Sequence, residues 1–466
     1  MRPEIYQYNF DWMLWRAIQA AGKLADGLEK ETRKMLNYIP YFRKTAEVFI
    51  GMGKPGITYL KLIERYLDNI VTAREKGKKI VMTTFCFSPS IFYAMDIVPV
   101  TLEVMTVLGA ALWKRGTTDY MDYCVELGFT ETSCSSQRGC LGAYLAGLGE
   151  EIDFIVTNTA GVCDTNANAF AFTRKYLDKP FYSLNYPSSL TDNPANQYHR
   201  DDFRALIRFL ESHTGTTLDP DRLRAVLDET AKQEAIVAEI EELQRLVPNP
   251  LPVTYNFVIY GGRFFFAGMP EYTELLTDMA EVVQDNAQNG RSGITSGSEK
   301  KRAFFFYIDH YTLNLSLWDW LDRHGISHIG SILSRSFKDD QPYMKGMEDA
   351  AYSIDTTDLD TMIDSIAMIN SRMPMVRSIR GPYDRPNMWK EESLALARIY
   401  KADCLIYNGT PGCRNTWSNV KLLAGDLEKA GYPTHIMYGD AFDERVESWE
   451  STAARLEEFF TIRGLL

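Results

Sequence analysis

A segment that recurs 250 residues apart is the feature of this sequence that most constrains its fold. Residues 153–163 read Asp-Phe-Ile-Val-Thr-Asn-Thr-Ala-Gly-Val-Cys, and residues 403–413 read Asp-Cys-Leu-Ile-Tyr-Asn-Gly-Thr-Pro-Gly-Cys. In both copies an Asp precedes a short run of strand-forming residues, an Asn ends it, and a Cys comes after four loop residues. Each copy then leads into a helix-like segment and a second, Pro-led strand. The repeat therefore predicts two related α/β units.

The rest of the chain fits around these two units. Strand-like runs alternate with helical patterns, which is typical of parallel sheets. We expect strands at residues 78–84, 153–158, 180–185, 302–308, 402–408 and 433–438. We divide the chain into an N-terminal helical region (1–75), a first α/β domain (76–198), a helical connector (199–250) and a second α/β domain (251–466). Residues 285–300 are rich in Gly, Ser and Asn and predict a surface loop.

Charge and hydropathy exclude several classes of protein. The chain carries 50 basic and 62 acidic residues, a net charge of −12, so it lacks the basic field that binds nucleic acid. No uncharged apolar run reaches the roughly 18 residues of a membrane span, and no signal-peptide pattern comes after Met1. We expect a cytoplasmic protein. Its seven cysteines are an odd number and sparse, which disfavours a disulfide framework and indicates reduced thiols.

Three cysteines are candidate ligands. Cys163 and Cys413 come after the carboxyl ends of the repeated strands, where ligands bind in open α/β sheets, and Cys134 immediately precedes a small-residue-rich helix at about 136–148. Helix N-termini lower thiol pKa values. This wide spacing fits neither zinc fingers, which use close cysteine pairs, nor the compact ferredoxin runs. It does fit a [4Fe–4S] cluster with three protein thiolates and one open iron, which could bind a substrate oxygen and pass electrons.

The other cysteines call for separate interpretations. Cys404 lies inside a strand and is expected to be a core residue, and Cys124 and Cys140 are expected to be buried structural thiols. Cys86 comes after the first strand on the side where the other ligands should lie. It is therefore a candidate for the wall of the site.

From about residue 75 to its end, the sequence resembles the 2-hydroxyacyl-CoA dehydratase family, which also includes subunits of ATP-dependent benzoyl-CoA reductase. The resemblance rests on short motifs in a matching order. They are the first strand with Ser88-Pro89 and Ile97-Val-Pro99-Val, Cys134 with Gly142-Ala-Tyr-Leu-Ala-Gly147, the loop of Cys163, and the loop of Cys413 with Gly439-Asp440.

The resemblance implies two Rossmann-like domains and a [4Fe–4S] cluster on Cys134, Cys163 and Cys413. It also implies anaerobic radical chemistry, in which an ATP-dependent iron–sulfur activator injects single electrons that reach an acyl-CoA thioester. The outcome would be dehydration, by a lyase, or reduction, by an oxidoreductase. A homologous second subunit or a second copy of the chain would complete the enzyme. One departure is Ile91, which stands where family members often carry a Glu, so the chain could instead be an electron-relay subunit.

Histidines and a glycine pair are further site candidates. His310 comes after a strand and is a candidate for the site wall, whereas His324 and His328 indicate a helix end entering a strand. Gly261-Gly262 resembles part of a phosphate-cradling turn, after which Arg263 would contact CoA phosphates or form a surface ion pair. No Walker A sequence is present, so ATP hydrolysis would belong to the activator.

Two other functions compete with an acyl-CoA enzyme. One is an electron-relay or double-cubane-type iron–sulfur protein of the same superfamily that takes no CoA substrate. The other is a non-enzymatic α/β binding protein whose cysteines serve only as core residues.

Overall fold

The computed structural model describes residues 47–112, 117–158, 161–307, 315–334, 351–410, 412–440 and 442–466. Two four-stranded parallel sheets organise this part of the chain. The first contains β1 (Ile80–Thr83), β2 (Val98–Thr101), β3 (Phe154–Asn158) and β4 (Phe181–Leu184). The second contains β5 (Lys301–Phe305), β6 (Ile326–Ser331), β7 (Cys404–Gly409) and β8 (Thr434–Tyr438). The predicted α/β class is confirmed.

The two sheets have the same topology. Their strand orders are β2-β1-β3-β4 and β6-β5-β7-β8, so the repeated segments form the third strand of each unit. The repeated aspartates also act alike. The Asp153 carboxylate accepts a hydrogen bond from the Ile80 backbone N–H at 2.8 Å, and that of Asp403 accepts one from Arg302 N–H at 2.8 Å. The sequence repeat therefore reflects a repeat of structure.

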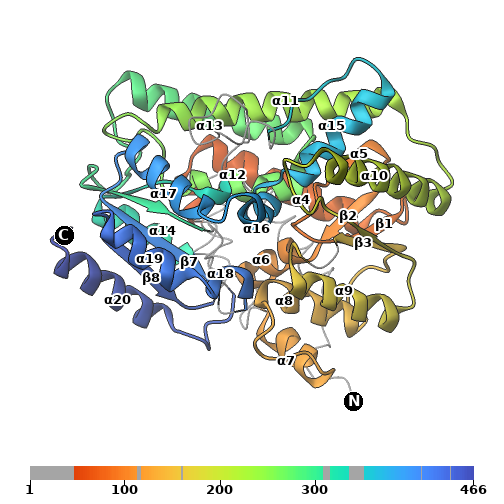
Figure 1. Cartoon of the computed structure of the whole chain (residues 1–466), viewed down its shortest axis with the longest axis horizontal. Coiled ribbons are helices and arrows are strands. Elements are labelled where there is room, and N and C mark those ends of the chain that lie inside the picture. The colour runs from red at the N-terminus through yellow and green to blue at the C-terminus, as the bar shows by residue number, and fades with distance from the viewer. Residues whose placement is uncertain are drawn as a thin grey trace.

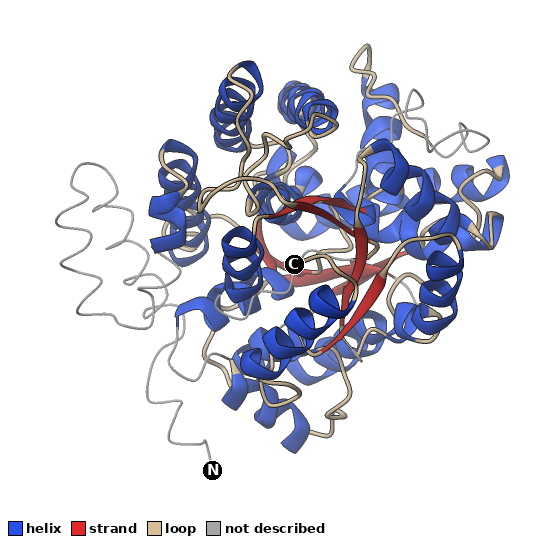
Figure 2. Cartoon of the chain, turned by 90° about the vertical axis from the view of Figure 1, so that its left-hand side faces the viewer, coloured by secondary structure: helices blue, strands red, loops and turns tan. Residues whose placement is uncertain are grey.

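Helices surround the strands (Figure 2). The first unit has α5 (Ser90–Ala94), α6 (Leu102–Leu112), α7 (Thr118–Glu126), α8 (Ser135–Leu145) and α9 (Asp164–Leu177). The second has α14 (Ser316–His324), α15 (Leu359–Ser371), α16 (Pro374–Asp384), α17 (Met388–Ile399), α18 (Arg414–Trp417), α19 (Val420–Lys429) and α20 (Trp449–Ile462), with a 3-10 turn at Ile332–Ser334. Because these helices cover the sheets, strands such as β1, β3 and β7 are buried at every residue, as parallel sheets require.

Four long helices lie between the two units in the chain. They are α10 (Asn193–Thr214), α11 (Pro220–Leu243), α12 (Tyr255–Phe266) and α13 (Pro270–Gln288). Figure 1 shows α11 and α13 side by side along one edge of the molecule, above both units, and the two helices are in contact. The loop predicted at 285–300 begins later than expected, because α13 continues to Gln288 and the helix ends at Asn289.

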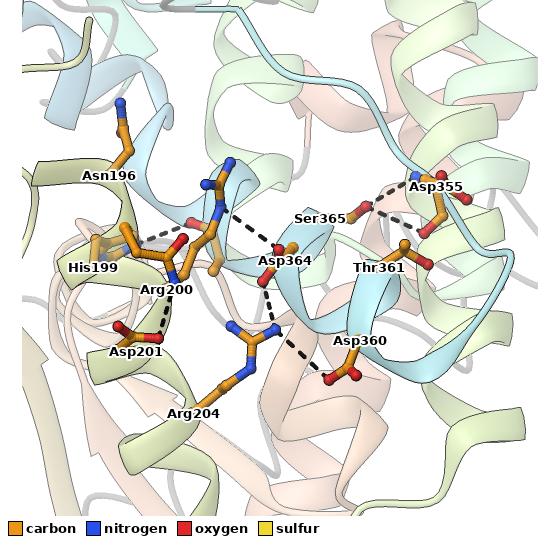
Figure 3. A network of polar contacts seen from close by, with 12 residues as sticks. Asn196, His199, Arg200, Asp201, Arg204, Asp355, Asp360, Thr361, Asp364 and Ser365 are labelled. Carbon is orange, nitrogen blue, oxygen red and sulfur yellow. Dashed lines mark hydrogen bonds and ion pairs between the residues drawn. The ribbon is translucent and has the colours of Figure 1, made fainter. Parts of the chain in front are cut away.

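The helix α10 joins the first unit to the second through polar contacts (Figure 3). Its Arg204 forms an ion pair with Asp364 on α15 at 2.7 Å, and the carbonyl oxygen of Ala367 lies 3.0 Å from Nε2 of His199. The other ring nitrogen of His199 lies 2.7 Å from the carbonyl oxygen of Asn185, which comes after β4. The helix thus ties the edge of the first sheet to a helix of the second unit.

The N-terminal helical prediction is partly visible. Within the described residues, α4 (Lys54–Val71) begins after Gly53 with Pro55 in its first turn, a position that proline favours. Its apolar face, including Tyr59, Ile63 and Tyr66, is buried. The apolar pattern of residues 10–18 lies outside the described residues. In the described ranges, no helix is both long and apolar enough to cross a membrane.

Glycines allow α8 to approach its neighbours closely. A Cβ added to Gly142 would lie 2.0 Å from the carbonyl oxygen of Tyr120 on α7, and one added to Gly139 would lie 2.5 Å from Cγ2 of Thr106 on α6. All eleven residues of α8 are buried. The small residues noted in the sequence therefore allow a buried helix to pack tightly, and this helix begins directly after Cys134.

Replacement of Gly142 by Ala tests this packing. Because the added methyl group meets backbone rather than a movable side chain, we expect Gly142→Ala to lower the free energy of unfolding by about 1–3 kcal/mol, the usual cost of overpacking. Gly425 lies inside α19 with nothing within 4 Å of an added Cβ, so Gly425→Ala should leave stability unchanged or raise it by up to about 1 kcal/mol. Urea unfolding measures both, and equal effects would contradict this account of α8.

Candidate functional site

A pocket between the two units brings the three predicted cysteines together. Its wall includes Cys134 and Cys163 from the first unit and Cys413 from the second, and Cys86 is a fourth member of that wall. The cavity between these side chains has a volume of about 30 Å³. Residues far apart in the sequence therefore meet in one place, as the repeat and the strand ends predicted.

Each of the three cysteines precedes the first turn of a helix. Cys134, Cys163 and Cys413 occupy the N-cap positions of α8, α9 and α18. Cys163 and Cys413 reach this position five residues after the repeated asparagines, Asn158 and Asn408, which lie at or next to the ends of β3 and β7. In Figure 1 the N-terminal ends of α8, α9 and α18 face the region between the two units.

Close backbone contact holds the loop of the second unit against the first. A Cβ added to Gly412 would lie 3.0 Å from both the Cα and the N of Cys134. The Asp440 carboxylate accepts hydrogen bonds from Ser135 at the start of α8 and from Thr410 Oγ1, the latter at 2.6 Å. Asp440 is buried and joins the two cysteine-bearing segments directly.

Hydrogen-bond donors surround the sulfurs. Tyr307 Oη lies 2.9 Å from the Cys413 sulfur, and Ser136 Oγ lies 2.8 Å from that of Cys134. The Asn166 backbone N–H in the first turn of α9 donates to the Cys163 sulfur at 3.5 Å. Donors of this kind stabilise thiolate ligands and tune the potential of a metal centre.

The expected lowering of the thiol pKa values is wrong. Burial raises the pKa of Cys134 to about 12 and that of Cys163 well above its ordinary value, and it raises the pKa of Cys413 as well. Loss of water around each sulfur outweighs the favourable effect of the helix N-terminus. Neighbouring cysteines add to the rise for Cys134 and Cys163, and the Asp164 carboxylate adds to it for Cys413.

Cysteine sulfurs are the main metal-binding groups on the wall of this pocket. Among the described residues, no three His, Cys, Asp or Glu side chains come close enough together to hold one metal ion. The four sulfurs nevertheless share a pocket whose other walls include the apolar side chains of Met375 and Ile379. The carboxylate of Asp164 is on the same wall, paired with Arg414 at 2.6 Å, so four sulfurs and one carboxylate form the donor set. Thiolate sulfurs are the ligands that an iron–sulfur cluster takes.

Two further cavities adjoin the cysteine pocket. One is almost entirely apolar, is lined by aromatic side chains including Phe257, Phe264 and Phe442, and shares Phe85 and Ser136 with the cysteine pocket. The other is a groove of mixed character that shares Gln137, Thr165 and Arg414 with it and has both Arg138 and the ring of Phe172 on its wall. The cysteines thus lie between an apolar space and a groove with both polar and apolar walls.

Glu103 places a carboxyl group on the wall of the apolar cavity. Its Oε1 accepts a hydrogen bond from Thr84 Oγ1 at 2.8 Å, and its Oε2 accepts one from the Phe85 backbone N–H at 3.1 Å. Burial raises its pKa to about 7, because the charged form loses its water more than these donors compensate. Glu103 can therefore gain or lose a proton near neutral pH.

The structure also locates the remaining candidates. Cys124, Cys140 and Cys404 are buried outside the pocket, on α7, α8 and β7. His324 ends α14 and His328 lies in β6, as predicted. His310 lies outside the described residues. The phosphate-cradling turn at 261–263 is wrong: these residues lie inside α12, where Gly262 makes room for the ring of Tyr272.

Sequence reasoning missed four residues that shape the site: Glu103, Asn166, Tyr307 and Asp440 as a link between the units. Asn166 comes three positions after Cys163, the spacing at which a helix N–H faces its N-cap side chain, so this contact was accessible from the sequence. Tyr307 and Glu103 had no such signal, because their role depends on which strand ends meet across the two units.

Comparison with known proteins identifies the family. Residues 84–462 match the family described as 2-hydroxyglutaryl-CoA dehydratase, D-component. The chain belongs to this family. It is also similar to one of the subunits of benzoyl-CoA reductase from Thauera aromatica, with 22% identity over 425 residues that span 86% of this chain and 92% of that subunit.

The family match includes every cysteine of the pocket and all of the strands except β1, since it begins at Thr84, directly after that strand. Ile91, the position at which this member of the dehydratase family departs from the expected Glu, lies on α5 and is buried in the core. Ile91 is not part of the pocket wall, whereas Glu103 lies on the wall of the adjoining cavity.

Removal of the Asp440 carboxylate tests the link between the units. We expect Asp440→Ala to make the cysteines of the iron-free protein react faster with a thiol reagent, because Ser135 and Thr410 lose their common acceptor and the pocket opens. Asp426→Ala, which removes a surface partner of Lys390, is the control and should leave the rate unchanged. An unchanged rate in Asp440→Ala would show that the backbone contacts alone close the pocket.

The raised pKa of Glu103 predicts a pH-dependent stability. The pKa of Glu103 is about 7 in the folded protein, against an ordinary value of 4.5. The folded state therefore binds this proton more tightly than the unfolded state does. The resulting stabilisation is complete below pH 4.5 and is lost as the pH rises through 7. In the iron-free protein, wild type should lose stability relative to Glu103→Gln by roughly 1.4 kcal/mol per pH unit across this window. A difference between the two proteins that is constant with pH would contradict the assignment.

Proposed function

We propose that this chain is the iron–sulfur subunit of a 2-hydroxyacyl-CoA dehydratase-like or aryl-CoA reductase-like enzyme, in which single electrons from an ATP-dependent iron–sulfur activator reach an acyl-CoA thioester. The observation that carries this proposal is the meeting of Cys134, Cys163 and Cys413 at one pocket. Family membership supports the same reaction class.

The three cysteines would hold a [4Fe–4S] cluster. Bound there, the cluster supplies single-electron transfer. Metal binding would release the protons of the three thiols, whose pKa values burial raises. Tyr307 and Ser136 would then donate hydrogen bonds to the thiolates of Cys413 and Cys134.

The two adjoining cavities would take different parts of an acyl-CoA molecule. The cavity beside Phe85 would take the acyl group and exclude water from it, since its lining is aromatic and aliphatic. The groove of mixed character would take the more polar part of the molecule beside Arg138 and Arg414, the latter at its junction with the cysteine pocket. Glu103, on the wall of the apolar cavity, would exchange a proton with a group bound there.

The benzoyl-CoA reductase relative is named as a subunit. We extend this to the present chain and propose that it acts with a homologous second subunit or a second copy of itself. This arrangement would let one chain receive electrons and the other contribute to the substrate site.

Anaerobic isolation tests the proposal. We expect about four irons and four sulfides per chain, and we expect Cys413→Ser to lower both. Cys404→Ser is the matched control, because Cys404 is a buried thiol of the same unit that lies in β7 away from the pocket. A protein that gains no iron on reconstitution would contradict the proposal.

A second measurement tests the substrate class. Addition of an aromatic or aliphatic acyl-CoA should change the visible spectrum of the iron-containing protein, whereas free CoA, which lacks the acyl group, should change it less. If neither acyl-CoA nor free CoA changes the spectrum, the result favours an electron-transfer protein that takes no CoA substrate.

A further inference from the structure

Cys86 is a buried nucleophilic side chain to which the proposed function assigns no role. It comes after β1, its side chain is fully buried, and it forms part of the same pocket wall as the three proposed ligands. Ile80 and Arg302 are equivalent residues of the two units, because each donates its backbone N–H to one of the repeated aspartates. Cys86 comes six residues after Ile80, and the residue six positions after Arg302 is Ile308. The sequence repeat therefore does not account for Cys86.

Several contacts fix the position of Cys86. A turn closed by the Phe87 N–H and the Thr84 carbonyl oxygen, 3.0 Å apart, surrounds it. The Tyr186 hydroxyl donates to its carbonyl oxygen at 2.6 Å, and the Asn166 side-chain amide donates to its sulfur at 3.5 Å. Asn166 therefore serves two sulfurs, because its backbone N–H donates to Cys163. The sulfur of Cys86 thus has the same kind of donor as the proposed ligands.

The four sulfurs belong to one pocket wall to which both units contribute. Cys86, Cys134 and Cys163 come from the first unit and Cys413 comes from the second. Cys86 therefore lies at the same cavity as proposed ligands from both units. The other buried thiols differ: the Cys124 sulfur donates to the Arg138 carbonyl oxygen at 3.5 Å, and Cys404 is enclosed by its own sheet.

We propose that Cys86 is a fourth protein ligand of the cluster, so that Cys86, Cys134, Cys163 and Cys413 each bind one iron. This inference rests on the proposed function. A cluster held by four thiolates would have no iron open to a substrate oxygen. It would supply only single-electron transfer, from the ATP-dependent activator to the thioester or to a partner chain.

Oxidation of the reconstituted protein tests the fourth ligand. A four-iron cluster with an open iron loses that iron on mild oxidation and gives a three-iron cluster, whereas four cysteines retain it. Wild type, Cys86→Ala and Cys140→Ala are loaded with iron anaerobically, oxidised with ferricyanide and followed by electron paramagnetic resonance and by a chelator that reports released iron. Cys140→Ala is the matched control, since Cys140 is a fully buried thiol outside the pocket.

We expect wild type and Cys140→Ala to keep their iron and Cys86→Ala to lose about one iron in four, with a three-iron signal. Conversion of wild type to the three-iron form would overturn the inference while leaving the proposed function intact. Wild type that binds no iron would overturn the proposed function as well. If Cys86→Ala does not fold, the wild-type result still decides between a retained and a lost iron.

Discussion

The parallel pairing of both sheets is the constraint on which the rest of the structure depends. In a parallel sheet all carboxyl ends lie at one edge, and the loops that leave this edge lead into helices whose N-termini face the same space. Here two sheets of identical topology present such edges to one another, so the loops after β3 and β7 meet with Cys163 and Cys413 at their ends. A site between the units is the consequence of this arrangement.

The contact between the units is short-range and polar at the site itself. Asp440 connects the start of α8 with the loop of Cys413, and Gly412 lets that loop approach the backbone of Cys134. Remote from the site, α10 ties the first sheet to α15. The cysteines are therefore held at a distance set by two independent connections, which suits a rigid metal centre better than a mobile binding surface.

Much of this arrangement was predictable from the sequence. The repeat at 153–163 and 403–413 specified two equivalent strands and the cysteines after them, because the local spacing of residues determines where a strand ends and its loop begins. The effect of burial on the thiols was not predictable: a cysteine at a helix N-terminus has a lowered pKa only where water remains, and the closure of the pocket depends on residues from both units. Glu103 and Tyr307 were missed for the same reason. The error at 261–263 arose because two glycines inside a helix resemble a turn until their packing partner, Tyr272, is known.

The central claim is that the cysteines at these three helix N-termini hold an iron–sulfur cluster. Diffraction from crystals of the anaerobically isolated protein, recorded on both sides of the iron absorption edge, tests it most directly. The account predicts a strong anomalous peak in the pocket between α8, α9 and α18, in contact with the sulfurs of Cys134, Cys163 and Cys413. Iron located elsewhere in the chain, or a pocket without an anomalous peak in protein that contains iron, would contradict it.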